Sequence, residues 1–345
     1  MQFLKALILA AFFASGTALA AIPISTCDEF QTLVGKNLSG SFYLANDIDC
    51  GAKPFLMLGT FTGQLDGRSF TMKNILVTRQ GGAMCCWSYG IFYSIGGTNP
   101  STLIKDIQFE NVTMYGGSDN IAGGLASRMT AGTIQNVKIN STIRLVTENA
   151  EGGGMIGNMS GGSILDSEVE TKFVLDSFGG IIGGVAGSAF GRSTVIRGVT
   201  VRNMMVKGSV NYLEGSGGGL VGILEGGALV EQSQVQSGLI AGLRAGGAFG
   251  AVYEATVRNI SVDKEVQVLA TFDYEFNAGG GLVGKVKCYS NISDSHTAAE
   301  VVACRTSKQN SAFGSVSCED PHPDAVPKSE RVVHSGTTSE NCVSR

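Results

Sequence analysis

The sequence predicts an all-β solenoid, a fold in which short coils of chain stack along one axis around a shared core. A pattern of an aliphatic residue, a polar residue, usually Asn, Asp or Gly, and then a small or apolar residue occurs eight times. Successive copies lie 27 to 35 residues apart, and a period of this size is typical of stacked supersecondary units. The third position of the pattern is held by Asn74, Asp106, Asn136, Asp166, Gly198, Gln232, Asn259 and Asp294.

The first twenty residues are expected to be an export signal. Lys5 supplies a positive charge, residues 6–14 form an apolar stretch, and residues 18–20 (Ala-Leu-Ala) form a small-residue cleavage site. The apolar stretch is too short to span a bilayer, and no later apolar run of about 18 residues follows it. We therefore expect residues 1–20 to be a signal peptide and the rest to be exported to the extracellular space, the cell surface or the periplasm, without membrane insertion.

The charge of the mature chain argues against two classes of partner. Removing the signal removes one basic residue, so 24 basic and 29 acidic residues give an expected net charge of −5. The sequence contains no block of basic residues. Nucleic acid and anionic lipid are therefore not expected to bind it.

Residues 21–60 are expected to form an N-terminal cap and the first strands. Thr26 and Glu29 have the spacing of a capping box, which predicts a short helix that ends near Leu33. This helix is expected to bury Phe30 and Leu33 over the open end of the first coil. An uncovered end would otherwise offer unpaired strand edges for aggregation.

The stacked coils are expected over residues 61–318, and residues 153–176 illustrate one of them. Three short segments with strand character are separated there by Gly-rich or polar turns. Ile164 and Val169 are both expected to point inward, which requires a corner at Asp166 because simple alternation fails at that position. Seven of the eight corner positions hold Asn, Asp or Gly, the residues that adopt a left-handed backbone at least cost.

A second element of each coil is a Gly-Gly-aliphatic-x-Gly block. It is complete at residues 153–157, 218–222 and 280–284, and three variants of it occur. Glycine is unfavourable inside a strand unless another group approaches the backbone closely. Either a tight inner corner or close packing between coils would supply that group. Because the blocks recur regularly and lack a following Gly-Lys-Ser/Thr, we interpret them as scaffold rather than as a phosphate-binding loop.

These blocks resemble the GLUG repeat of bacterial surface adhesins, haemagglutinin-like proteins and the non-catalytic regions of some IgA-cleaving metalloproteases. Residues 42–49 (FYLANDID), 61–67 (FTGQLDG) and 72–75 (MKNI) are similar to the segment that commonly precedes such repeats. The likeness extends from about Tyr43 to about Gly314. It implies a right-handed parallel β-helix, here of about eight coils. The metalloprotease activity of some relatives is not implied, because no HExxH motif occurs.

The eight cysteines are expected to form disulfides near both ends of the solenoid. Cys288 and Cys318 each lie four residues after a repeat glycine and 30 residues apart, so adjacent coils would place them within disulfide range. This pairing leaves Cys304 with Cys342 to fasten a polar C-terminal tail, residues 319–345. The four N-terminal cysteines are expected to pair among themselves: Cys27, Cys50, Cys85 and Cys86.

Catalytic, cofactor-binding and metal-ligating residues are not expected from the sequence. The chain has three His, no HExxH and no G-x-S-x-G motif. A carbohydrate-active enzyme of β-helix fold would place two acids side by side on adjacent coils, and the two outward columns that align from the sequence do not. Asp166, Glu168 and Glu170 lie within one coil and are interpreted as a solvated face.

The single Trp lies on an insertion between the first corner and the first Gly block. Trp87 and Tyr89 follow the Cys85-Cys86 pair, so they could form a ligand-contact platform, or they could pack over the first coil. The sequence favours a surface or extracellular binding module that adheres to a glycan or protein on another surface by multivalent contact on a rigid rod. A polysaccharide lyase or hydrolase is the alternative, and an ice-binding protein, which would need a flat Thr ladder, comes third.

Overall fold

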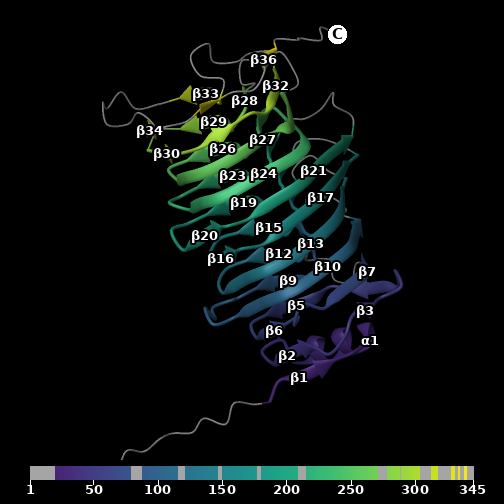
Figure 1. Cartoon of the computed structure of the whole chain (residues 1–345). Helices are drawn as coiled ribbons and strands as arrows, with labels where there is room; N and C mark the ends of the chain where they lie inside the picture. The colour runs from purple at the N-terminus through teal and green to yellow at the C-terminus, as the bar shows by residue number, and fades with distance from the viewer. Residues whose placement is uncertain are drawn as a thin grey trace, which may run out of the picture.

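The chain folds into a parallel β-solenoid of about seven turns with one short helix near the N-terminus (Figure 1). The computed structural model describes residues 20–78, 88–115, 121–146, 150–176, 180–208, 215–270, 278–287, 289–303 and 312–317, and three short strands between residues 328 and 339. The expected fold class is thereby confirmed, with about seven turns where the sequence suggests about eight.

Three sheets run the length of the solenoid, and every strand pairing in the described ranges is parallel. Sheet A contains β1 (Ile22–Ile24), β2 (Ser41–Leu44), β3 (Ile48–Asp49), β4 (Pro54–Leu56), β6 (Gln64–Asp66), β7 (Thr71–Thr78), β10 (Leu103–Tyr115), β13 (Thr133–Leu145), β16 (Gly162–Leu165), β17 (Glu168–Leu175), β20 (Thr194–Arg197), β21 (Thr200–Gly208), β24 (Leu229–Gly242), β27 (Thr256–Ala270), β30 (Asn291–Ser293), β31 (His296–Thr297), β32 (Glu300–Ala303), β34 (Lys328–Glu330), β35 (Val333–His334) and β36 (Thr338–Ser339). Sheet B contains β5 (Leu58–Phe61), β9 (Phe92–Ile95), β12 (Ala126–Met129), β15 (Ile156–Met159), β19 (Ala186–Phe190), β23 (Val221–Glu225), β26 (Phe249–Tyr253), β29 (Val283–Lys287) and β33 (Phe313–Ser317). Sheet C contains β8 (Ser88–Tyr89), β11 (Ile121–Gly123), β14 (Glu151–Gly153), β18 (Ile181–Gly183), β22 (Ser216–Gly218), β25 (Arg244–Gly246) and β28 (Ala278–Gly280).

One coil visits the sheets in the order C, B, A. In the coil predicted at residues 153–176, β14 lies in sheet C and β15 in sheet B, and the chain then crosses sheet A as β16 and β17. The predicted register is confirmed in this region, because Ile134 pairs with Ile164 and Ile139 with Val169. All four side chains are at most 3% exposed, so these columns form the core.

The predicted alignment of the first repeat is wrong. Met72 pairs with Phe109 instead of Ile104, and Ile104 pairs with Leu65. In this first turn the chain rounds the corner at Gly67, Arg68 and Ser69, where two residues have positive φ. Asn74 therefore lies opposite Asn111, a later left-handed residue of the next coil.

The left-handed corners are confirmed. All eight residues at the third position of the pattern have φ between 47° and 67°, including Gln232. Two of the corner amides donate along the stack, from Asn136 Nδ2 to Asp106 Oδ1 at 2.6 Å and from Asn74 Nδ2 to Asp49 Oδ1 at 2.9 Å. These bonds hold neighbouring corners together.

A serine directly after three of the eight corners adds a further link between coils. The Ser167 hydroxyl donates to the Leu165 carbonyl at 2.7 Å and accepts the Val137 N–H at 3.1 Å. Ser233 and Ser295 make the same two bonds in their own coils. Each serine thus accepts a hydrogen bond from a buried backbone N–H of the coil beside it. Without this partner, the buried N–H would destabilise the fold.

Both reasons expected for the Gly-Gly block hold. A Cβ on Gly153 would lie 1.7 Å from the Ile156 carbonyl oxygen of its own corner. A Cβ on Gly154 would lie 2.2 Å from the Gly184 carbonyl oxygen of the next coil. The first glycine therefore permits the tight corner, and the second permits the close stacking of coils.

A short helical segment covers the N-terminal end of the core. It consists of α1 (Cys27–Glu29) and a π-helical turn (Phe30–Val34), and the predicted capping box between Thr26 and Glu29 is present. Phe30 is buried, but Leu33 is 37% exposed and Val34 is buried in its place, which corrects the prediction. The wider π turn brings residues four apart to the same face, so Val34 follows Phe30 into the core.

A disulfide joins Cys27 of the cap to Cys50. This pair agrees with the expectation that the N-terminal cysteines bond among themselves. The remaining candidates lie outside the described residues: Cys85, Cys86, Cys288, Cys304, Cys318 and Cys342.

The ladder of sheet A continues into the segment expected to be a polar tail. Strands β34, β35 and β36 pair with β30, β31 and β32. Residues beyond 318 thus contribute at least three strands to the solenoid.

Replacing Gly154 by Ala tests the close stacking of coils. The added methyl group would clash with a backbone carbonyl that cannot move without breaking the ladder, so we expect a loss of about 2 kcal/mol or more in unfolding free energy. The control is Gly35→Ala, because Gly35 has a helical φ of −62° and a Cβ there would meet only a Leu58 methyl group at 3.2 Å. Denaturant unfolding measures both, and equal losses would contradict the interpretation.

Candidate functional site

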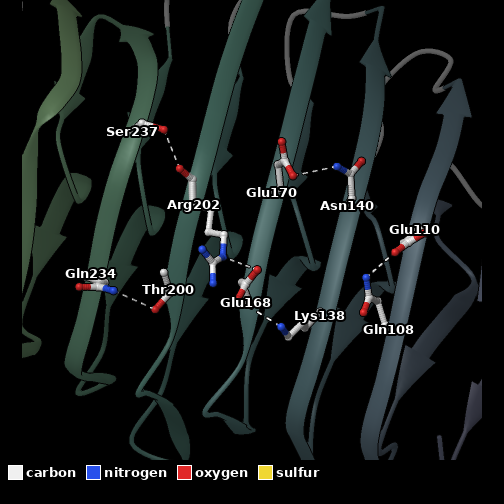
Figure 2. A network of polar contacts seen from close by, with 10 residues as sticks. All are labelled: Gln108, Glu110, Lys138, Asn140, Glu168, Glu170, Thr200, Arg202, Gln234 and Ser237. Atoms are coloured by element: carbon white, nitrogen blue, oxygen red, sulfur yellow. Dashed lines mark hydrogen bonds and ion pairs between the residues drawn. The ribbon is translucent and has the colours of Figure 1, made fainter. Parts of the chain in front are cut away.

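The outward surface of sheet A carries two rows of polar side chains, which we call the polar face (Figure 2). The first row lies two residues after the corners on β10, β13, β17, β21 and β24, and strand pairing aligns it. The second row lies further along the same strands. The polar face consists of Gln108, Lys138, Glu168, Thr200 and Gln234 in the first row and Glu110, Asn140, Glu170 and Arg202 in the second.

Most of the first row is one of the two outward columns that align from the sequence. The residue that the first turn contributes to this column needs a correction. The repeat pattern implies that Leu76, two residues after the Asn74 corner, begins this column, but Thr71 pairs with Gln108, and Leu76 pairs with Thr113. The cause is the changed register of the first turn. The second row was not aligned from the sequence, although its four residues each lie four positions after a corner, in four consecutive coils.

Glu168 lies at the centre of the polar face and is paired on both sides. The Arg202 guanidinium bonds one carboxylate oxygen, and Lys138 Nζ lies 3.7 Å from the other. Arg202 above all, and Lys138 with it, hold the pKa of Glu168 below its ordinary value, although partial burial opposes this shift. A carboxyl group held ionised in this way is poorly suited to donate a proton as a general acid.

The other two glutamates are held by amides. Asn140 Nδ2 donates to Glu170 Oε2 on the neighbouring strand at 3.0 Å, and Gln108 Nε2 donates to Glu110 Oε1, two residues further along the same strand. Asn140 lies between Glu110 and Glu170 in the stack, so the row alternates acid, amide and acid (Figure 2). At these three positions, which belong to neither outward column aligned from the sequence, no two acids are direct neighbours.

The polar face is hollowed over its first three strands. A depression of about 370 Å³ is lined by Gln108, Phe109, Glu110, Asn111, Lys138, Ile139, Asn140, Glu168 and Glu170. Phe109 is fully buried and Ile139 is 3% exposed, so the groups that a ligand would meet are mostly polar. The depression is therefore equipped to form several hydrogen bonds to one ligand.

Of the two residues proposed from the sequence as a ligand-contact platform, the structure describes only Tyr89, and it does not belong to this surface. Tyr89 lies in β8 of sheet C and is only 6% exposed. Trp87 lies outside the described residues. In the part of the chain that the structure describes, no group of three or more His, Cys, Asp or Glu side chains is arranged to hold a metal ion.

The comparison with known proteins gives a partial relationship. No protein-family model matches the chain. Halomucin of Haloquadratum walsbyi is 31% identical over 105 residues, which are 30% of this chain and 1% of that protein. The chain thus spans about 1% of the length of the relative that it matches. It is a β-solenoid protein with distant, partial similarity to halomucin. No family is assigned to it.

One observation bears on the compartment. The Cys27–Cys50 disulfide fits an oxidising environment such as the outside of the cell. No helix among the described residues is long and apolar enough to cross a membrane.

The pairing of Glu168 predicts a pH-dependent contribution to stability. A carboxyl group whose pKa is lower in the folded state stabilises the fold above its unfolded pKa, and this contribution is lost as the pH falls through the folded pKa. Stability conferred by Glu168 should therefore be complete at neutral pH and decline below about pH 4.5. Glu168→Gln should be less stable than the original protein at pH 7, and the difference should shrink on acidification.

Urea unfolding at several pH values measures this difference. The control is Glu265→Gln, since the Glu265 side chain is 56% exposed and lies 3.8 Å from Lys264. A difference for Glu168→Gln that stays constant with pH, or one that the control reproduces, would contradict the assigned role.

Proposed function

We propose that this protein is an exported binding module, located at a cell surface or outside the cell, that adheres to a glycan or protein on another surface. Attachment would come from several weak contacts on a rigid rod, without covalent chemistry. The observation that carries the proposal is the polar face, where donors and acceptors from consecutive coils line one depression. Contacts presented together on one rigid body reinforce each other, because binding at one site raises the effective concentration at the next.

The Gly-Gly blocks support a relationship with GLUG-repeat proteins as part of this proposal. Their glycines are required by geometry, since Gly124, Gly154 and Gly184 each face a carbonyl oxygen of the next coil within 2.3 Å of a built Cβ. A sequence that repeats this Gly-Gly block would share the shape of its coils with the adhesin-like proteins that it resembles. The resemblance therefore favours adhesion over the other functions found on solenoids.

A carbohydrate-active enzyme is the second candidate, and the three glutamates at the depression are the observation that favours it. A glycosidase needs one carboxylic acid to protonate the leaving group and a second carboxylate as base or nucleophile. Glu168 is held ionised by Arg202 and Lys138. Glu110 and Glu170 have the Asn140 amide between them. These contacts support binding more than proton transfer.

Ice binding is the third candidate and has less support. It would require a flat ladder of Thr on one face, whereas the first row of the polar face contains Gln108, Lys138, Glu168 and one Thr, Thr200. Long charged side chains in such a row would interrupt a flat surface.

Single replacements of the three glutamates by glutamine test binding against catalysis. For a binding module, Glu110→Gln, Glu168→Gln and Glu170→Gln should each weaken ligand capture by about tenfold or less, because a single hydrogen bond contributes about 1 kcal/mol. For an enzyme, one of the three should lower turnover by about 10²- to 10⁴-fold without loss of stability.

The measurement is capture on an array of immobilised glycans and proteins, with parallel turnover assays on polysaccharides. Thermal unfolding of each variant controls for folding. Polysaccharide cleavage that one replacement abolishes would overturn the proposal in favour of the enzyme. Absence of capture on every probe would also refute it.

A further inference from the structure

A second feature lies on the same two strands as the depression, beyond Glu110, and it points to one class of ligand. Beyond Glu110, the outward residues of β10 are Thr113 and Tyr115, and they pair with Thr142 and Arg144 of β13. Tyr115 is 57% exposed, which makes it one of the most exposed large side chains among the described residues. An aromatic ring therefore lies on the same sheet face as the depression, at the far end of the same strand.

The distance between the two features suits an elongated ligand. Tyr115 lies five positions after Glu110, but Asn111 between them is the extra residue of a bulge, so the span equals the four positions from Asn140 to Arg144 on β13, about 13 Å of strand. The hydroxyl-bearing side chains of Thr113 and Thr142 lie side by side between them. The strand pair thus offers a continuous track that begins with carboxylates and amides, passes two hydroxyl groups and ends at an exposed ring.

The chemistry of this track matches a chain of sugar rings. Amides, carboxylates and hydroxyls can each bond the hydroxyl groups of a carbohydrate, and an exposed Tyr ring offers an apolar face with a polar tip. A protein partner would be expected to need a buried, mainly apolar centre with aromatic or Arg anchors. The depression has a mostly polar lining, so the glycan is the better match.

The charge of the track indicates whether a neutral or an acidic glycan binds there. Glu168 is balanced by Lys138 and Arg202, and Arg144 is paired with Asp176. The bonds found for the Glu110 and Glu170 carboxylates come from neutral amides, those of Gln108 and Asn140. The depression therefore presents net negative charge, which would repel a uronate or sulfate group.

We propose that the polar face and Tyr115 form one binding track for a neutral oligosaccharide that lies along β10 and β13. The reducing or non-reducing end contacts Glu110, Asn140 and Glu170, and a later ring stacks on Tyr115. This inference rests on the proposed function and names its ligand. It assigns Tyr115, Thr113 and Thr142 a role in ligand contact.

The test uses the full chain and a panel of neutral and uronate-containing oligosaccharides, with affinity measured by titration calorimetry. Tyr115→Ala should weaken binding of the neutral ligand by about 5- to 10-fold, in line with the contribution of a stacked aromatic ring. The control is Tyr289→Ala, because Tyr289 is similarly exposed, at 55%, and lies outside the track. It should change the affinity by less than about twofold.

The double variant Glu110→Gln/Glu170→Gln tests the charge argument. It removes two negative charges at nearly constant shape, so it should weaken neutral ligands and relieve the exclusion of acidic ones. A preference of the original protein for acidic glycans would refute the proposed binding track. Equal losses of affinity for Tyr115→Ala and Tyr289→Ala would also refute it. Capture of glycans or proteins that is unaffected by Tyr115→Ala would leave the binding module standing and refute the track alone, whereas no capture at all refutes both.

Discussion

The spacing of parallel strands is the constraint on which the rest of this structure depends. Backbone hydrogen bonds hold successive coils about 4.8 Å apart, so each residue meets its equivalent in the next coil at nearly the same distance. Gly154 is required because the Gly184 carbonyl oxygen approaches within 2.2 Å of where a Cβ would lie. The corners need positive φ so that every coil turns at the same place, and Asn136 and Asp106 bond each other there.

The same spacing brings equivalent outward side chains together, which makes their charges interdependent. Arg197, Glu231 and Arg258 alternate in sign on three consecutive coils, with ion-pair distances of 3.0 and 2.5 Å. Like charges at these positions would repel each other, since stacking leaves them no room to separate. The polar face follows the same rule with Lys138 and Glu168, and Asn140 separates two acids. A surface built for stacking in this way is also a surface whose donors and acceptors are presented at regular intervals to a ligand.

The sequence predicted those features that recur at the same position in successive repeats. The period located the coils, the Asn and Asp residues located the corners, and the glycines indicated the close contacts. The first turn was misaligned because it has two left-handed corners. Asn74 is one of them but stacks on Asn111, whereas the corner beside Asp106 is the one at Gly67 to Ser69. Leu33 was misplaced because a π turn is not visible in a helical pattern. The four residues of the second row share one spacing after the corners. The pairing of Arg202 with Glu168 depends on a bulge between β17 and β21, and a bulge is not visible in the sequence pattern.

Disulfide trapping tests the register of the polar face most directly. Cysteines introduced at Lys138 and Glu168, which pair in the ladder, would lie about 5 Å apart and should form a disulfide under mild oxidation. Cysteines at Lys138 and Glu170 would lie about 8 Å apart and should not bridge without backbone movement. Peptide mapping of the oxidised proteins, which also identifies any exchange with native cysteines, should find the first bridge and not the second. Equal yields for both pairs, or a bridge in the second pair alone, would contradict the register from which the polar face is built.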